Sequence, residues 1–248
     1  QPCQTVSKFG SQDEVGNLNH VTPAMTLAAA KLVTKGKAYR LGIETNKDTP
    51  AYPPRWFKLT ILQPGQAGGA TLGPTRTTYN DDIVTGWNGI GSQIDGFGHI
   101  GIDNLYFNCN RAGDFAMADG LTKLGIENVP AVATRGILLD MAGYFGTDIV
   151  KEGTPFNRAE IEGARYLASL GVAMVGADNP SVEVIPFEKD AGVFEVHQIL
   201  LALNGIHILE NMNTAELVKD QAWEFLFTLG PARITGAVQA IVNPVAIR

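Results

Sequence analysis

The sequence predicts one globular domain of the α/β class, and three observations support this prediction. Helix-type apolar periodicity over Pro155–Leu170 ends at Gly171 and leads directly into the apolar run GVAMVGAD, which is typical of a helix–turn–strand unit. Apolar residues make up 45% and charged residues 18% of the 248 residues, as in a globular protein with a sizeable core. No internal repeat or low-complexity linker interrupts the chain, so we expect one domain spanning residues 1–248.

The N-terminal half is expected to begin with a helix and to continue in short strands. Thr22 followed by Pro23 is typical of a helix start, and a helix of about three turns should end before Gly36. The Gly- and Thr-rich stretch over residues 65–86 should form mainly loops, which in compact domains are often functional. The strands expected here are AYRLGIET from Ala38, Trp56–Leu62, Thr75–Tyr79 and a short one near Ile83.

The C-terminal half shows denser apolar runs that alternate with helical patterns. Helices are expected over Val196–Asn204 and over residues 214–221, where Thr214 provides a cap. Strands are expected over Gly136–Met141, Ile206–Leu209, residues 223–230 and residues 232–248.

Composition also bears on partners and compartment. The net charge is −6 and no run of Lys and Arg stands out, which argues against a nucleic-acid partner. No apolar run has the length of a membrane span. The chain begins at Gln1 without a leader pattern, so we expect a soluble protein, either cytoplasmic or secreted or periplasmic after leader removal. Cys3 and Cys109 form either one disulfide or two free thiols.

Two pairs of residues have the chemistry of a reactive or metal site. Asp95 and His99 lie four positions apart among glycines, and a carboxylate with an imidazole can bind a metal or transfer a proton. A structural Asp–His hydrogen bond would give the same local pattern. His197 and Glu210 lie on successive predicted elements that can meet side by side, although ordinary surface residues would have the same spacing.

A family resemblance gives these residues more weight. The segment from Gly89 to His99 reads GIGSQIDGFGH and resembles the signature His-x-Gly-Thr-His-x-Asp-x-x-x-His of the cyclase family. That family includes bacterial kynurenine formamidase, isatin hydrolase and trans-dienelactone hydrolase. Further similar segments are DEVGNLNHVTP, RGILLDM, VGADNPS and VHQILLALNGIHILENMN, so the resemblance extends from about Phe9 to the end of the chain.

The resemblance implies roles for four residues. Asp95 matches the metal-ligand Asp of the signature, and His197 and Glu210 match the downstream metal ligands. His99 matches the closing His, which implies a general acid/base beside the metal.

Two signature positions differ from the family. Gly89 and Gln93 stand where the family has imidazole ligands, and Gln93 retains only a neutral carbonyl oxygen as a ligand atom. The remaining set is at most one site, rich in oxygen with one nitrogen. Such a set favours manganese or magnesium, while zinc and a metal-free protein stay open.

The resemblance also implies a fold and a reaction. The expected fold is a swivelling β/β/α domain with a partly open mixed β-barrel and flanking helices, assembled as a homodimer or homotetramer. The expected reaction is the opening of a small cyclic ester, cyclic amide or formamide by metal-activated water, with His99 as the base. The alternatives are a non-hydrolytic cyclase, isomerase or dehydratase that uses Asp95 and His99 as acid and base, and a non-catalytic binding protein.

Aromatic residues near the signature are candidates for contact with a flat ring substrate. Each of them is also explained by ordinary core packing. Arg55 has the geometry to bind a substrate carboxylate, although an exposed arginine is the simpler interpretation. His207 alternates with two isoleucines and should be a satisfied or solvent-facing strand residue. The candidates for the substrate wall are Tyr52, Trp56, Trp87 and Phe97.

Overall fold

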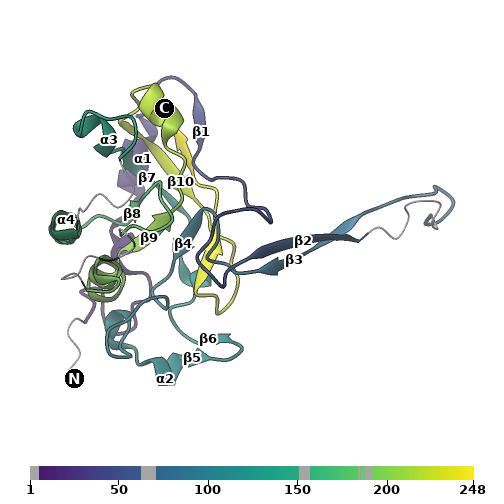
Figure 1. The fold of residues 1–248 in the computed structure, drawn as a ribbon, viewed down its shortest axis with the longest axis horizontal. Helices are drawn as coiled ribbons and strands as arrows, with labels where there is room; N and C mark the ends of the chain where they lie inside the picture. Colours follow the sequence, from purple (N-terminus) through teal and green to yellow (C-terminus); the bar gives the residue numbers. More distant parts are fainter. Residues whose placement is uncertain (1–5, 63–70, 151–156, 184, 186, 188–191) are drawn as a thin grey trace.

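Two four-stranded sheets form the centre of the molecule, so the predicted mixed α/β class is confirmed (Figure 1). The computed structural model describes residues 6–62, 71–150, 157–183, 185, 187 and 192–248. The first sheet is antiparallel, in the order β1 (Ala38–Arg40), β12 (Val245–Ile247), β10 (Glu224–Leu229) and β7 (Val132–Ile137). The second sheet has the order β11 (Gln239–Ile241), β4 (Gln93–Asp95), β9 (His207–Glu210) and β8 (Met174–Gly176).

The two central strands of the second sheet, β4 and β9, are buried on both faces, and these two faces differ in character. Side chains alternate between the faces of a strand, so Ile94 lies opposite Gln93 and Asp95. Ile94 packs in one apolar cluster with Leu209 of the same sheet and Phe225 of the first sheet. This cluster joins the two sheets, and it leaves the other face of β4 for polar residues.

A second apolar cluster covers that other face. It combines Ile208 of β9 with residues of the helical segment that begins at α5 (Glu195–His197) and continues as the π-helical η4 (Gln198–Leu203). This segment corresponds to the helix predicted over Val196–Asn204. The polar side chains of β4 are therefore enclosed between the second sheet and the helical segment that packs over it.

The helix–turn–strand unit expected in the second half of the chain is confirmed. The helix is α4 (Asn157–Ser169), it ends before Gly171 at φ +69°, and β8 follows as the strand. The parallel pairing of β8 with β9 is the right arrangement for such a unit. Pro155 and Phe156, with which the prediction began, lie outside the described residues.

The first predicted helix is also present, although it is shorter than expected. It is α1 (Pro23–Ala30), and Thr22 caps it by accepting a hydrogen bond from the backbone N–H of Met25 at 3.3 Å. Thr26 on this helix donates to the carbonyl oxygen of Ala133 at 2.6 Å, which fixes α1 against β7.

Several predicted strand boundaries are wrong. The strand predicted at Thr75–Tyr79 is only an isolated bridge between Leu72 and Thr77. The strand predicted over Gly136–Met141 is displaced, because β7 ends at Ile137 and the short helix α3 (Met141–Tyr144) begins where the strand was expected to end. Asp140 accepts a hydrogen bond from the N–H of Gly143 at 2.8 Å, so its side chain caps a helix where a strand was predicted.

A two-stranded arm projects far from the body of the molecule (Figure 1). It consists of β2 (Phe57–Leu62) and β3 (Asp81–Gly86), paired antiparallel. Both strands match the strands expected near these positions. A smaller hairpin, β5 (Ala116–Met117) with β6 (Gly120–Leu121), follows α2 (Ala112–Phe115).

Three further expectations concern a barrel, a membrane span and a disulfide, and the remaining helices are short. None of the sheets formed by the described residues closes into a barrel, so the partly open barrel stays a prediction. Within the same residues, no helix combines the length and apolar character needed to cross a membrane. Cys109 is disulfide-bonded, which is one of the two alternatives left open by the sequence, and Cys3 lies outside the described residues. The other helices are η1 (Gly16–His20), η2 (Phe107–Cys109), η3 (Ile126–Asn128) and α6 (Ala215–Lys219).

Candidate metal centre

Strand register brings four polar side chains to one face of the second sheet. Gln93 and Asp95 lie two positions apart on β4 and therefore share a face. Glu210 on β9 is paired directly with Gln93, and Gln239 on β11 is paired directly with Asp95. Residues that face each other across two strands also share a face. The face therefore carries two carboxylates and two carboxamides, all buried.

His197 completes the group from the opposite side. It comes from α5 and is buried, with its Nε2 at 3.3 Å from Oε1 of Glu210 and 3.8 Å from Oδ2 of Asp95. The three residues Asp95, His197 and Glu210 each offer a ligand atom, and these atoms all lie within 4.8 Å of one another. The structure thus brings together three of the four residues for which the sequence predicted metal ligation, and the fourth is Gln93.

The chemistry of this group fits a divalent cation. Oδ2 of Asp95 is buried and has no hydrogen-bond partner among the described residues, although buried carboxylate oxygens are normally paired. Two carboxylate oxygens and one imidazole nitrogen form a donor set that manganese and zinc both accept. A bound cation would also offset the negative charge of carboxylates that are buried away from water.

The two carboxamides hold the other carboxylate oxygens. The Nε2 of Gln239 donates to Oδ1 of Asp95 at 2.6 Å. The Nε2 of Gln93 donates to Oε2 of Glu210 at 2.9 Å and to Oδ1 of Asp95 at 3.3 Å. Gln93, expected to offer a carbonyl oxygen as ligand, is a hydrogen-bond donor to both carboxylates in this arrangement. Each carboxylate therefore keeps one oxygen that faces His197.

Gln239 also explains the glycine at position 89. A Cβ atom on Gly89 would lie 2.3 Å from Oε1 of Gln239, so the carboxamide fills the space that a side chain at position 89 would need. Sequence analysis missed Gln239, because nothing in the run AVQAIV marks it. Its contact with Asp95 joins residues 144 positions apart and depends on strand pairing alone.

Glu183 is a second residue that sequence analysis missed. Its buried Oε1 accepts hydrogen bonds from the backbone N–H of His197 at 2.9 Å and from Nδ1 of the same residue at 2.6 Å. The only sequence signal is one acidic residue in the apolar run SVEV, which is too weak to indicate a role.

Burial and charge shift two pKa values at this centre in the same direction. The pKa of Asp95 is raised, chiefly because burial disfavours its charged form and because Glu210 is close. Burial alone would lower the pKa of His197, but its hydrogen bonds to Glu183 and Glu210 outweigh this effect and raise the pKa to about 9. Without a cation the centre therefore retains protons that a cation would displace.

His99 lies beside the centre in a different electrostatic setting. Its ring centroid is 6.3 Å from that of His197, and its backbone N–H donates to the carbonyl oxygen of Gly96 in a turn after β4. Burial lowers the pKa of His99, and the charges of His197 and Arg55 act in the same direction while Asp95 opposes them. The imidazole is therefore neutral near pH 7 and able to accept a proton.

Three of the four predicted wall aromatics are exposed near the base of the arm. Trp56 and Trp87 contact each other edge to face, with ring centroids 5.5 Å apart, and both are partly exposed, as is Tyr52. Arg55 connects this region to the signature loop, the segment of residues 89–92 that precedes β4. Its Nη1 donates to the carbonyl oxygen of Gly89 at 2.6 Å. This half-buried arginine is thus not the freely exposed side chain that was the simpler expectation.

Phe97 occupies a different position from the one expected. It is 1% exposed and packs on Phe107 and on the ring of His207, whose centroid is 4.0 Å away. This placement makes Phe97 a core residue instead of part of a substrate wall. His207 is also buried, and its Nδ1 has no hydrogen-bond partner among the described residues, so the prediction of a satisfied or solvent-facing histidine is wrong.

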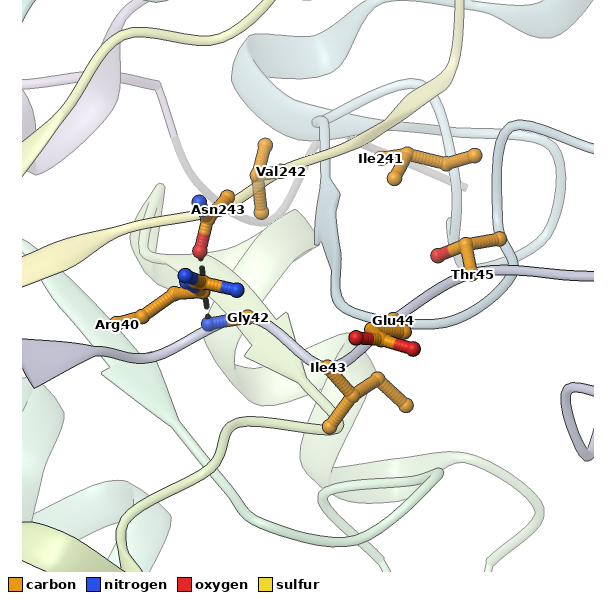
Figure 2. Close-up of a pocket in the computed structure, with 8 residues that line it drawn as sticks. All are labelled: Arg40, Gly42, Ile43, Glu44, Thr45, Ile241, Val242 and Asn243. Carbon is orange, nitrogen blue, oxygen red and sulfur yellow. Dashed lines mark hydrogen bonds between the residues drawn. The ribbon is translucent and has the colours of Figure 1, made fainter.

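A cavity of about 350 Å³ lies next to the strands of the centre (Figure 2). It is bounded by residues 40 and 42–45 and by residues 241–243, where the side chain of Asn243 accepts a hydrogen bond from the N–H of Gly42 at 3.2 Å. Ile241 in its wall is paired with Gln93 on β4. None of the predicted site residues lines this cavity, so it borders the centre without containing it.

Comparison with known proteins places the chain among enzymes of related fold. No protein-family model matches the sequence, and no curated protein matches it significantly. The crystal structure of a novel cyclase superposes with a TM-score of 0.86 and 26% identity, covering 97% of this chain and 98% of that one. The structure of a potential metal-dependent hydrolase with cyclase activity gives a TM-score of 0.53 and 16% identity over 85% and 98% of the two chains.

Isatin hydrolase A from Ralstonia solanacearum has the same fold at lower identity. It superposes with a TM-score of 0.59 and 12% identity over 92% of this chain and 99% of that one. The fold is thus shared along nearly the whole chain, and the carboxylates and imidazoles expected from the signature meet at one place. The chain is therefore similar in fold to the cyclases and metal-dependent hydrolases that these structures represent, in agreement with the family resemblance of its sequence.

Proposed function

We propose that the protein is a metal-dependent hydrolase that opens a small cyclic ester, cyclic amide or formamide. The observation that carries this proposal is the convergence of the unpaired Oδ2 of Asp95 and one oxygen of Glu210 with Nε2 of His197, next to a neutral His99. When bound there, a divalent cation supplies Lewis-acid chemistry, polarising a water molecule and the substrate carbonyl. One cation per chain, manganese or zinc, suits the two-oxygen, one-nitrogen set.

The proton transfers are assigned to His99. Its neutral imidazole accepts a proton from the attacking water and returns it to the leaving oxygen or nitrogen as the ring opens. Asp95 helps in two ways, because its Oδ2 faces the centre while its charge stabilises the His99 imidazolium that forms. His99 thus transfers the proton while Asp95 stabilises charge, as in other sites where neighbouring titratable groups have pKa values that are shifted apart.

The proposed substrate is a flat cyclic molecule. Trp56, Trp87 and Tyr52 present partly exposed aromatic surface near the base of the arm, and Arg55 ties that surface to the signature loop. Exposed aromatic side chains of this kind favour planar, partly apolar ligands.

A second candidate function is a reaction without hydrolysis, in which Asp95 and His99 act as acid and base in a cyclase, isomerase or dehydratase. The carboxamides of Gln93 and Gln239 favour it, because they already satisfy one oxygen of each carboxylate without a cation. Product analysis in ¹⁸O-labelled water separates the two functions. A hydrolase places solvent oxygen in the product, and an isomerase or dehydratase leaves the product unlabelled.

We also propose that the chain assembles as a homodimer or homotetramer. A two-stranded hairpin is marginally stable by itself in water, yet β2 and β3 extend from the body with several exposed apolar side chains. An arm of this kind gains stability by packing against a second copy. The exposed apolar residues of the arm are Leu59, Ile61, Leu62, Ile83 and Val84.

The first test of the proposed function is the metal content of the purified protein, measured by plasma mass spectrometry. About one divalent cation per chain is expected after incubation with manganese or zinc. Asp95→Ala and His197→Ala should lose it, while His20→Ala, a control outside the centre, should keep it. A parent protein that binds neither metal would overturn the metal-dependent mechanism and favour the second candidate function.

A further inference from the structure

We propose that Glu183 is a positioning residue that fixes the ring of His197 so that Nε2 faces the metal centre. Glu183 belongs to neither the matched signature nor the group of three converging ligand atoms. The inference rests in part on the proposed function, since it assigns Nε2 to a cation. The contact itself, however, is a property of the protein alone and can be tested without metal.

Geometry gives Glu183 two hydrogen bonds to one residue. The Nδ1–H of His197 donates to Oε1 of Glu183 at 2.6 Å, and the backbone N–H of His197 donates to the same oxygen at 2.9 Å. Both partners are buried, so water does not compete for either bond. A proton held on Nδ1 by a carboxylate makes Nε2 the nitrogen that offers its lone pair to a cation, once the cation has displaced the proton on Nε2.

The backbone contact also positions the helix that carries His197. His197 lies at the start of a helical segment, where N–H groups have no partner within the helix. Glu183 supplies an acceptor for one of them, and a negative charge near a helix start is stabilising. The same carboxylate thus fixes the place of the backbone and the rotation of the ring.

The loop that carries Glu183 also holds a second proposed ligand. The backbone N–H of Val182 donates to Oε1 of Glu210 at 3.1 Å, and Oγ of Ser181 accepts from the N–H of Glu183 at 3.3 Å. Ser181 is itself buried, which stabilises this conformation of the loop. Residues 181–183 therefore orient His197 and Glu210 together, although they contribute no ligand atom to the group.

The charge on Glu183 has a further effect on its histidine. A carboxylate hydrogen-bonded to Nδ1 increases the electron density of the ring and makes Nε2 a better metal ligand. Loss of such a partner in metalloproteins commonly weakens metal affinity by about 10–100-fold. The neutral amide of Glu183→Gln keeps the shape and one acceptor, so we expect it to recover most of the ring orientation and part of the affinity.

The test combines proton NMR of the metal-free protein with calorimetric titration of zinc. The wild type should show a strongly downfield Nδ1–H resonance that is absent from His197→Ala. Glu183→Ala should lose this resonance and bind zinc about 10–100-fold more weakly. Glu183→Gln should keep the resonance, shifted upfield, and show an intermediate affinity. Glu195→Ala removes an acidic side chain two residues from His197 and should behave as wild type in both measurements.

The outcomes separate this inference from the proposed function. A resonance that is lost in Glu183→Ala from a protein that binds no zinc would support the positioning role and contradict the metal-dependent mechanism. An unchanged resonance together with unchanged zinc affinity in Glu183→Ala would overturn the role of Glu183. Should Glu183→Ala fail to fold, the same decision comes from Glu183→Gln, because an unshifted resonance and wild-type affinity in that variant would also overturn it.

Discussion

At the scale of single residues, the site depends on two histidines whose pKa values are shifted in opposite directions. His99 and His197 have ring centroids 6.3 Å apart, yet burial lowers the pKa of His99 while hydrogen bonds to Glu183 and Glu210 raise that of His197. Burial and hydrogen-bonded carboxylates together therefore decide which imidazole is neutral and accepts a proton and which one pairs with carboxylates. The family resemblance predicted both histidines. It did not predict Glu183, which contacts His197, or Gln239, which contacts Asp95, because these contacts depend on long-range packing that no local pattern encodes.

The role of His99 predicts a specific loss of activity. His99→Ala should lower turnover by about 10²–10⁴-fold, the usual contribution of a positioned acid or base, while leaving metal content and fold unchanged. The rate of the wild type should fall in acid with a pKa below 6.5, since burial lowers the pKa of this imidazole. Steady-state kinetics across pH on a lactone or cyclic amide would measure both effects. Full activity in His99→Ala would contradict the assignment.

The raised pKa of His197 predicts pH-dependent metal binding. A cation must displace the proton on Nε2, so apparent affinity should increase with pH up to the pKa of about 9. One displaced proton corresponds to about tenfold in affinity per pH unit in this range. Calorimetric titration with zinc in two buffers of different ionisation enthalpy would count the released protons. An affinity that is flat between pH 6 and 8 would show that no proton is displaced.

At the scale of elements, the register of a very short strand determines the site. β4 has only three residues, Gln93–Asp95, which are too few for an alternating pattern to predict a strand. The longer α4, by contrast, spans enough turns for its periodicity to be visible in the sequence. The sequence thus predicts long elements well, whereas very short strands are specified by the neighbouring strands with which they pair.

The close packing of the signature loop on β11 predicts a stability effect. A methyl group on Gly89 would meet Oε1 of Gln239 at 2.3 Å, so Gly89→Ala should lower the free energy of unfolding by about 1–3 kcal/mol. Adding Gln239→Ala removes the clash and should make the two effects non-additive in a double-mutant cycle. Chemical denaturation measures each variant. Gly163→Ala in α4 is the control, because a Cβ there meets no atom within 4 Å.

At the scale of the whole molecule, a buried histidine links folding to pH. His207 is fully buried against Phe97, and burial lowers its pKa to about 3, with the charge of Asp13 opposing the shift. The unfolded chain, with an ordinary histidine pKa near 6.5, therefore binds a proton that the folded protein excludes over the range between the two values. The stability that neutral His207 contributes is complete above pH 6.5 and is lost as the pH falls towards 3.

The corresponding measurement is the free energy of unfolding against pH. One excluded proton contributes a slope of up to about 1.4 kcal/mol per pH unit, with stability decreasing below pH 6.5. His207→Phe, which fills similar space without a titrating group, should reduce this slope. His20→Ala, which removes a half-buried histidine at the end of η1, should leave the slope unchanged. An equal slope in His207→Phe and the wild type would exclude His207 as its source.

The arm predicts how the assembly responds to charge. Val84→Asp places a carboxylate on an exposed apolar position of β3 and should shift a dimer or tetramer towards monomer, because burying an unpaired charge is costly. Light scattering after size-exclusion chromatography reads the mass directly. Leu27→Asp on α1, at another exposed apolar position away from the arm, should leave the mass unchanged. A monomeric wild type would refute the proposed assembly.

The pairing of β11 with β4 also has a consequence for synthesis on the ribosome. Gln239 reaches Asp95 across 144 positions of sequence, and β11, the strand that carries it, is synthesised after all three proposed ligands. A nascent chain that stops short of this strand has Asp95, His197 and Glu210 but lacks the edge strand that pairs with β4 and supplies the hydrogen bond to Asp95. Because such distant contacts form late, cation loading should follow the synthesis of β11 and its pairing with β4.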